Sequence, residues 1–479
     1  MPFMCQCAYS CSFKSPFGTV LINTYRIPTR LFITGGGEIK SSEGTTQGDT
    51  LAMADYGVSV TPLIDLLKHR VDEVLQVWLA DDATGAGKLV VLKNWWIQII
   101  EEGKMFGYHV KPSKSWLILK NPELQDQAEL LFQDNPINIT TSGKRHLGAA
   151  LGSQAFKNSY IDEKVSEWCD RLMKLSQIAK SQPHAAYSAF IHGEQHRYTY
   201  FMRTIEDITE NLKPLDKVID DHFIPALFGR EITVEERELL AIQVKEGGLG
   251  IREVNSNSST SYQTSKEITQ PLIKQIVNQS NNLPQEDDVR KARASAMSKI
   301  RERQEKETNE IKAKQSPGVQ RTLLQTSEPG ASSWLGALPL AQHGFDLSKA
   351  EFHDALNLRY NKQLKNLLTE CVCGKKFNVT HALDCKNGGF VNVRHNNIRD
   401  LEARMMKTIC NDVEIEPTLQ KVTNTTNFRR SANIKEDARP DIRTRGFWRA
   451  GQNAFFDVRV KGSTIFMVSS FNYKKREFR

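Results

Sequence analysis

The stretch VDEVLQVWLADDATGAGKLVVLKNWWIQIIEEGKMFGYHVKPSKSWLILK, residues 71–120, decides the fold of the first half of the chain. It opens with VDEVLQVWLADDAT, whose apolar residues flank a tight acidic turn and predict a strand pair. In residues 88–107 the apolar residues recur at helical spacing, which predicts an amphipathic helix. The segment SWLILK then predicts another strand. Strands and a helix alternating in this way predict an α/β domain.

The turn of the predicted strand pair carries two adjacent carboxylates, Asp81 and Asp82. Two neighbouring negative charges repel each other unless they hold a cation. Polymerases use such a pair, with a third carboxylate from another strand, to hold two Mg²⁺ ions. The two aspartates are therefore a candidate catalytic site for Mg²⁺ or Mn²⁺. The alternative is a solvated turn that binds nothing.

The rest of the chain divides by composition on both sides of this stretch. Upstream, residues 16–63 predict short strands, a glycine turn and then a helix in LAMADYGVSVTPLIDLL. Downstream, residues 121–251 predict mainly helices. Residues 252–330 are polar and then densely charged, which predicts a solvated helix or coiled segment joining two domains. Residues 331–479 return to a globular pattern.

The overall composition favours a nucleic-acid partner and argues against a membrane protein. The 479 residues include 64 Lys and Arg against 56 Asp and Glu, a net charge of +8, and phosphate backbones attract such an excess. No apolar run is long enough for a transmembrane helix, so we expect no membrane partner. Residues 1–15 form an atypical leader without a signal peptide's apolar core. Eight cysteines do not make a disulfide scaffold, which favours a reducing, intracellular compartment.

The order of motifs around the acidic turn resembles motifs B, C and D of reverse transcriptases. This resemblance covers residues 16–251 and implies a partial palm over residues 16–120, followed by a helical thumb-like region over residues 121–251. It implies that motif B binds nucleotide and template, that motif C binds Mg²⁺, and that the motif D lysine lies near the triphosphate. The matching residues are, in motif order, Gln47 and Gly48, Asp81 and Asp82, and Gly107 and Lys114.

One part of the polymerase site is missing from the sequence. In reverse transcriptases a further aspartate comes from motif A, which precedes motif B, but residues 1–37 contain neither Asp nor Glu. Without that carboxylate the two-metal geometry cannot be completed within this chain. We therefore expect a polymerase half that is truncated at its N-terminus and does not synthesise DNA by itself.

A Cys/His cluster lies in the predicted module of residues 331–390. It reads Cys371-x-Cys373-x7-His381-x3-Cys385 and supplies three thiolates and one imidazole within 15 residues. Tetrahedral Zn²⁺ prefers such ligands, and four of them leave no open position, so we expect structural zinc. Lysines nearby suggest that the zinc holds a loop facing nucleic acid. The alternative is an incidental grouping of buried cysteines with a surface histidine.

The last predicted region, residues 391–479, contains a second acidic constellation. Arg394 and His395 open an amphipathic helix, Asp441 precedes a predicted strand, and Asp457 lies inside the apolar run FFDVRV. Two such aspartates can share a divalent cation that activates water for attack on a phosphodiester. The alternative is a surface Asp441, with Asp457 in a structural salt bridge to Arg459.

The order of Cys/His cluster, Arg-His-Asn, Pro-Asp and Asp resembles the restriction-like endonuclease of site-specific non-LTR retrotransposons. The resemblance covers residues 330–460 and implies that Asp441 and Asp457 bind Mg²⁺ or Mn²⁺. It also implies that Arg394 and His395 support the site or touch phosphate. Arg459 stands where the family has a lysine, and an arginine, which stays charged, is a poor proton shuttle. The tail is short, so we expect this region to be cut before it closes.

Together these features predict an α/β protein made of a partial palm, a thumb-like region, a charged helical linker and a zinc-stapled endonuclease-like domain. The expected function is ancestral: target-primed reverse transcription, in which the endonuclease nicks a DNA target and the polymerase copies an RNA template. Such a protein is made in the cytoplasm and acts in the nucleus. Two alternatives remain open: a non-catalytic nucleic-acid-binding protein, and a chimeric gene product without a stable fold.

Overall fold

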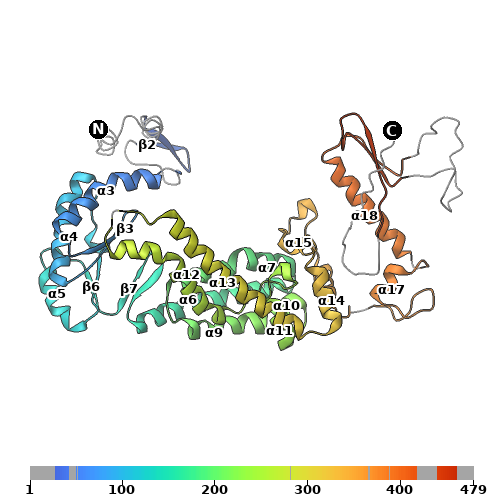
Figure 1. Cartoon of the computed structure of the whole chain (residues 1–479), viewed down its shortest axis with the longest axis horizontal. Coiled ribbons are helices and arrows are strands. Elements are labelled where there is room, and N and C mark those ends of the chain that lie inside the picture. Colours follow the sequence, from blue (N-terminus) through green and yellow to red (C-terminus); the bar gives the residue numbers. More distant parts are fainter. Residues whose placement is uncertain are drawn as a thin grey trace. The chain divides into compact units, whose positions relative to one another are not determined.

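The computed structural model describes residues 27–41, 50, 52–280, 282–364, 367–387, 389–417 and 440–460. Helices predominate, and the strands form small sheets of two or three strands (Figure 1). The predicted α/β class is confirmed at this level. The leader of residues 1–15 and the tail beyond residue 460 lie outside the described residues.

The elements follow one another along the chain with few long loops. Up to residue 152 they are β1 (Thr29–Ile33), β2 (Gly37–Ser41), α3 (Ala52–Arg70), β3 (Leu75–Leu79), β4 (Asp82–Ala86), α4 (Leu89–Gly103), η1 (Lys104–Phe106), η2 (Pro112–Lys114), β5 (Trp116–Ile118), η3 (Pro122–Leu124), α5 (Gln125–Phe132), β6 (Asn138–Thr140), β7 (Gly143–His146) and β8 (Ala149–Gly152). A mainly helical region follows: α6 (Gln154–Ala179), α7 (Pro183–Ala189), η4 (Phe190–Glu194), α8 (Gln195–Thr204), α9 (Thr209–Val218), η5 (Ile219–Phe223), α10 (Ile224–Phe228), α11 (Val234–Ala241), η6 (Val244–Glu246), α12 (Val254–Val277), α13 (Glu286–Ala313) and α14 (Pro317–Thr326). The last elements are α15 (Ser333–Gly336), η7 (Ala341–His343), α16 (Lys349–Arg359), α17 (Val379–Asp384), α18 (Phe390–Lys407), β9 (Val413–Ile415), β10 (Ile442–Arg445) and β11 (Asn453–Phe456).

Contacts between residues divide the chain into two compact units. One takes Met1–Lys174, His192–His222 and Glu253–Glu307, and the other takes Leu175–Ile191, Phe223–Arg252 and Thr308–Arg479. The domain limits predicted at residues 120, 251, 330 and 390 stay predictions.

The strand pair predicted around the acidic turn is present in the first unit. Strands β3 and β4 pair antiparallel with Leu79 opposite Asp82, so Ala80 and Asp81 form the turn, and Ala80 takes a left-handed φ of 53°. The predicted helix is α4, which packs with α3 beside the hairpin. A Cβ at Gly85 on β4 would come within 2.7 Å of the Trp95 ring, which explains a glycine in this strand. Side chains of α3, α4 and the segment between α3 and β3 form one apolar core: Val60, Leu63, Leu67, Val71, Val74, Trp95 and Ile99.

The segment SWLILK forms strand β5, as predicted, and pairs in parallel with β6. Its Leu117 lies in a second apolar cluster with Trp96 of α4 and Phe132 of α5. Because α4 contributes Trp95 to one cluster and Trp96 to the other, it joins the acidic hairpin to the β5–β6 pair.

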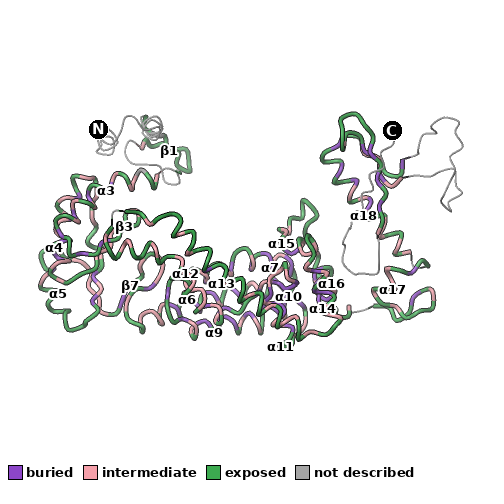
Figure 2. The backbone as a smooth tube through the Cα atoms, viewed as in Figure 1, coloured by how far each residue is buried: buried purple, intermediate pink, exposed green. Residues whose placement is uncertain are grey.

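The segment predicted as a charged helical linker is helical, and its first helix packs closely in the first unit. Helix α12 lies along α8 and α9, and the Asp216 carboxylate accepts the backbone N–H groups of Val254 at 2.6 Å and Asn255 at 2.8 Å. An acceptor there satisfies donors that a helix N-terminus leaves unpaired. Burial raises the Asp216 pKa, although these hydrogen bonds lower it. Helix α13 is exposed along most of its length (Figure 2).

In the second unit, α7, α10 and α16 pack together around buried polar anchors. The Tyr187 hydroxyl donates to the Leu249 carbonyl at 2.8 Å. Arg359, fully buried on α16, donates to the carbonyls of Val244 at 3.0 Å and Gly248 at 3.1 Å. These hydrogen bonds offset part of the cost of burying the guanidinium, whose Nε atom makes no hydrogen bond within the described residues.

The same unit contains the three-stranded antiparallel sheet β11-β10-β9. Helix α18 covers one face, where Ala403 and Met406 pack against Ile442 and Phe456. None of the described helices is both long and apolar enough to cross a membrane.

Candidate functional site

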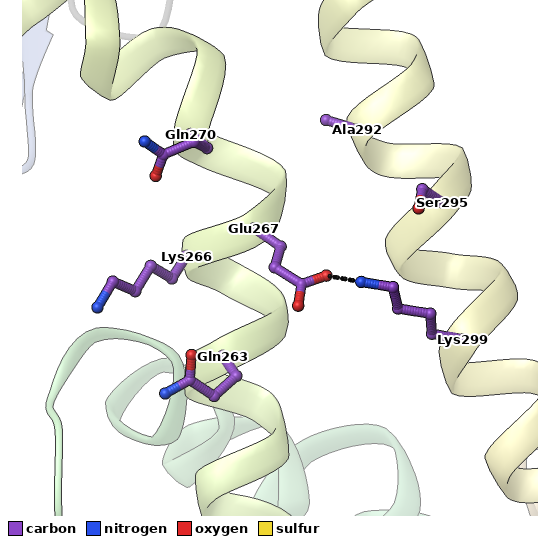
Figure 3. A pocket seen from close by; sticks show the side chains of 7 residues that line it. All are labelled: Gln263, Lys266, Glu267, Gln270, Ala292, Ser295 and Lys299. Carbon is purple, nitrogen blue, oxygen red and sulfur yellow. Dashed lines mark hydrogen bonds and ion pairs between the residues drawn. The ribbon is translucent and has the colours of Figure 1, made fainter.

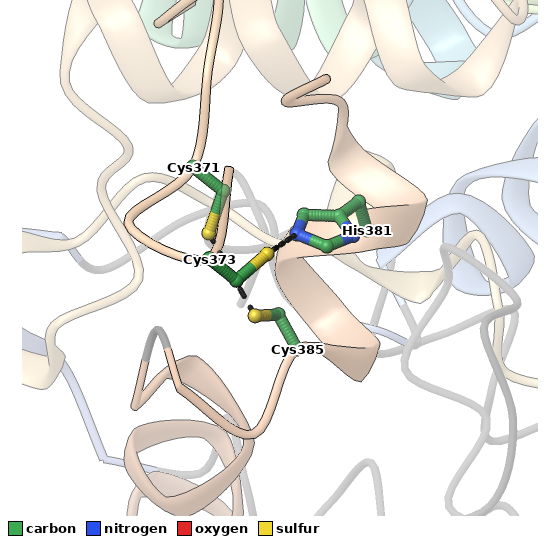
Figure 4. Close-up of side chains that lie close together, drawn as sticks. All are labelled: Cys371, Cys373, His381 and Cys385. Atoms are coloured by element: carbon green, nitrogen blue, oxygen red, sulfur yellow. Dashed lines mark hydrogen bonds between the residues drawn. The ribbon is translucent and has the colours of Figure 1, made fainter. Parts of the chain in front are cut away.

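The four residues of the Cys/His cluster come together in the structure. Their ligand atoms all lie within 4.8 Å of one another, and among the described residues this is the group of three or more potential ligands that could hold a metal. The Sγ atoms of Cys371 and Cys385 are 3.7 Å apart, and Cys373 Sγ lies 3.2 Å from His381 Nε2 (Figure 4). The predicted grouping is therefore confirmed as a spatial cluster.

A tight turn and a short helix bring these ligands together. The Gly374 N–H donates to the Cys371 carbonyl at 2.8 Å, and Gly374 takes a φ of +75°, a region that favours glycine. The Asn378 side chain caps α17 by accepting the His381 N–H at 2.8 Å. The Cys385 N–H donates to the His381 carbonyl, so these two ligands lie one helical turn apart.

The cluster has the dimensions of a tetrahedral zinc site. With Zn–S bonds near 2.3 Å, two sulfur ligands of a tetrahedron are about 3.8 Å apart, close to the observed sulfur–sulfur distance. A hydrogen bond from the Cys373 backbone lowers the Cys371 pKa, but burial and the thiols of Cys385 and Cys373 leave it above its ordinary value. A cation would offset this mutual repulsion of thiolates. The cluster can thus bind a metal such as zinc through Cys371, Cys373, His381 and Cys385.

The surroundings of the cluster are exposed and charged, with a small excess of lysines. Lys375, Lys376 and Lys386 are exposed, as are the acidic residues Glu370 and Asp384, and Val372 at the turn is 83% exposed. Two of the cysteines are buried, but the histidine is partly accessible. The module therefore places positive charge at its surface while its thiols face inward.

At the acidic turn between β3 and β4, the carboxylates of Asp81 and Asp82 face solvent beside the phenol side chains of Tyr56 and Tyr108. The Tyr108 hydroxyl donates to the Asp81 carbonyl at 2.9 Å. Burial, and then the negative charges of the two aspartates, raise the Tyr56 pKa. Burial, Tyr56 and the same aspartates raise the Tyr108 pKa to about 12. Both phenols therefore stay protonated beside the turn at neutral pH.

The other predicted polymerase residues do not complete this site. Lys114 is exposed in η2, and no hydrogen bond or ion pair in the described part of the chain joins it to the acidic turn. Gln47 and Gly48 lie outside the described residues. The described residues also bring no third carboxylate into a metal-binding group with Asp81 and Asp82. This geometry does not fit a Mg²⁺ or Mn²⁺ site.

Asp441 of the endonuclease-like region is largely buried at the start of β10, with a side chain only 14% exposed. One of its oxygens accepts the Val458 N–H at 2.5 Å, and the other lies 3.4 Å from His395 Nε2. His395 lies within α18, which begins at Phe390 rather than at Arg394 as predicted. The alternative of a surface Asp441 is therefore wrong.

Asp457 does not lie inside a strand, as the apolar run around it predicts. Strand β11 ends at Phe456, and the Asp457 side chain is 61% exposed and pairs with Arg459 Nε at 2.8 Å. The alternative of an Asp457–Arg459 salt bridge is therefore present in the structure. Asp441 accepts the backbone N–H of Val458, and Asp457 pairs with Arg459. The described residues therefore form no Mg²⁺ site here.

Helix α18 contributes residues that the sequence analysis missed. Burial and then the negative charge of Asp441 raise the Glu402 pKa, so the Glu402 carboxyl lies near Asp441. Arg399 is buried and pairs with Asp400 and Glu416. The signal was the helical spacing of positions 395, 399 and 402, which places them on one face. Arg394 is half-buried, and its Nε atom makes no hydrogen bond within the described residues.

An open groove of about 420 Å³ lies between α12 and α13. Figure 3 shows the Glu267–Lys299 ion pair, 2.9 Å long, that spans it. The residues that line the groove are Gln263, Lys266, Glu267, Gln270, Ala292, Ser295 and Lys299. This lining is polar and solvated, without the converging buried groups of a small-molecule site.

A scan against models of protein families and a search of curated proteins return no match for this sequence.

Proposed function

We propose that the chain derives from a non-LTR retrotransposon polyprotein and that its second half acts on DNA as a zinc-stapled, endonuclease-like domain. The observation that carries this proposal is a continuous arrangement in one unit. The Cys/His cluster ends at Cys385, α18 begins at Phe390, and His395 on that helix lies 3.4 Å from Asp441. The endonuclease resemblance implies this order of zinc module, helix and acidic centre.

The proposed partners are a DNA target and an RNA template, and the proposed site of action is the nucleus. The net charge of +8 and the exposed lysines at the cluster support nucleic acid as the partner. The zinc has a structural role in this proposal, because four protein ligands leave no open position for water or substrate.

A second candidate function is nucleic-acid binding without chemistry, and two observations favour it. The acidic turn lacks a third carboxylate within the described residues, and Asp457 is engaged by Arg459. Cleavage would require the Asp457 carboxylate to leave Arg459 and turn toward Asp441. Because this ion pair is exposed, breaking it costs about 1 kcal/mol or less.

Plasmid nicking separates the two candidates. The full chain, loaded with zinc, is incubated with supercoiled plasmid and Mg²⁺ or Mn²⁺. The endonuclease function predicts nicking that is lost in Asp457→Ala, an exposed position where the substitution leaves the fold intact. Asp354→Ala, at an exposed aspartate of α16 in the same unit, is the matched control. Nicking that is equal in wild type and Asp457→Ala would reject an endonuclease, whereas salt-dependent binding without nicking would support the second candidate.

Primer extension tests the first half of the chain. We expect no template-dependent synthesis by the purified chain with either metal, because the carboxylate set is incomplete. Synthesis that disappears in Asp81→Asn would show that the missing carboxylate is supplied from elsewhere in the chain.

A further inference from the structure

The outer face of the β10–β11 hairpin carries aromatic and arginine side chains. Side chains alternate along paired strands, and Ile442, Thr444, Ala454 and Phe456 are buried beneath the sheet. Arg445 and Phe455 alternate with them on the strands and face outward, and Trp448 and Arg449 are exposed in the loop that connects the strands. We define the aromatic–arginine face as these four residues: Arg445, Trp448, Arg449 and Phe455.

Both aromatic rings of this face are substantially exposed. The Trp448 side chain is 68% exposed and Phe455 is 50% exposed. One exposed apolar residue is ordinary, but two large rings on one short hairpin leave apolar surface in water without benefit to folding. This pattern indicates a surface that is covered by a partner.

The loop that carries Trp448 is closed by a backbone hydrogen bond and by ring contacts. The Gly446 N–H donates to the Gln452 carbonyl at 2.8 Å, which closes the loop. The Phe447 ring packs edge-on against Trp448 at 4.7 Å and against Phe456 of the core at 5.2 Å. The exposed indole is thus supported from the apolar core. A ring held in this way loses little conformational freedom when it binds a ligand.

The charges of the hairpin favour an anionic partner. From Ile442 to Phe456 the chain has three arginines and no acidic residue. Arg443 pairs with Asp412 and Glu414 near strand β9. Among the described residues, no ion pair includes Arg445 or Arg449, and both are exposed. The Arg445 Nε atom donates to the Gly451 carbonyl at 3.3 Å, which holds this side chain against the loop. The exposed guanidinium groups of Arg445 and Arg449 are therefore placed at the loop end of the hairpin, where phosphate can reach them.

We propose that the aromatic–arginine face binds a single strand of nucleic acid, with bases stacked on Trp448 and Phe455 and phosphates held by Arg445 and Arg449. Every base has a flat π face that an exposed ring can stack on, and arginine follows the backbone charge. In a duplex the bases are already stacked on one another, so the rings have less to gain there. This binding face deepens the proposed function. It rests on that function in one respect, the choice of nucleic acid as the ligand.

Fluorescence anisotropy of the full, zinc-loaded chain tests this surface. The probes are a labelled 20-nucleotide oligothymidine and a labelled duplex of equal length, without Mg²⁺, so that cleavage cannot interfere. Trp448→Ala is expected to weaken binding of the single strand about five- to 150-fold. Trp448→Phe keeps a stacking surface and is expected to restore most of the affinity. Arg449→Gln is expected to reduce the slope of log Kd against log salt by about 0.7, the effect of one phosphate contact on a single strand.

Matched controls lie elsewhere in the same unit. Phe345→Ala removes an aromatic ring that is 54% exposed outside the sheet, and Arg404→Gln removes an exposed arginine on α18. Equal loss of affinity in Trp448→Ala and Phe345→Ala, or unchanged binding in Trp448→Ala, would overturn the proposal. Binding that depends on Trp448 in a chain that nicks no plasmid would reject the endonuclease alone. Plasmid nicking by a chain whose affinity for the single strand is unchanged in Trp448→Ala would reject the binding face alone.

Discussion

Replacing Cys373 with alanine tests the metal centre most directly. Within the described residues 367–387, the buried residues are Cys371 and Cys385 alone, so this module has no apolar core of its own. A metal held by the four ligands would therefore be the main source of its stability. The neighbouring α18 and sheet have a separate apolar cluster and are expected to stay folded when the metal is lost.

The size of the effect follows from the number of ligands. Structural zinc sites in small modules bind with about 10–16 kcal/mol at neutral pH, so each of four ligands contributes about 2.5–4 kcal/mol. Loss of the Cys373 thiolate is then expected to weaken zinc binding about 100- to 1000-fold. The remaining ligands would still hold the metal, but too weakly to survive a competing chelator.

Two measurements on the full chain check this prediction. Competition with a chromophoric chelator gives the zinc affinity, and amide hydrogen exchange of residues 367–387 gives the stability of the module. Cys169→Ser, a cysteine of α6 outside the cluster, is the control and is expected to keep one tightly bound zinc. A Cys373→Ala variant with wild-type zinc affinity, or exchange unchanged by zinc removal, would refute the assignment.

Three further predictions concern the turn and the second unit. Gly374→Ala forces a side chain into a φ of +75°, which costs about 1–2 kcal/mol, so zinc competition should show about five- to 30-fold weaker binding. Arg359→Met removes a fully buried guanidinium and leaves its carbonyl acceptors without a donor, so urea unfolding should show a loss of about 1–3 kcal/mol; unchanged or higher stability would contradict this. Burial raises the pKa of Glu236, but hydrogen bonds from Arg230 and Lys362 outweigh it and lower the pKa from 4.5 to about 2. Because the folded-state pKa is depressed, this stability is present above pH 4.5 and is lost as the pH falls toward 2. Thermal unfolding of Glu236→Gln should therefore depend less on pH in that window, and a dependence equal to that of wild type would disprove the assignment.

Several parts of the structure could be predicted from the sequence because their causes are local. The β3–β4 hairpin, α4 and β5 each follow from the spacing of apolar residues within a short segment. The Cys/His cluster could be predicted for the same reason. Its ligands lie within 15 residues, so a tight turn at Gly374 and one turn of α17 are enough to bring them together.

The tertiary structure decided what depends on distant parts of the chain. The burial of Asp441 requires α18 to place His395 beside the end of the sheet, and no local pattern encodes that packing. The exposure of Asp457 depends on which face of β11 the helix covers. The sequence alone determined which cysteine, histidine and aspartate residues could serve as metal ligands. Only packing determined which carboxylates meet, because that is set by contacts between elements far apart in the chain.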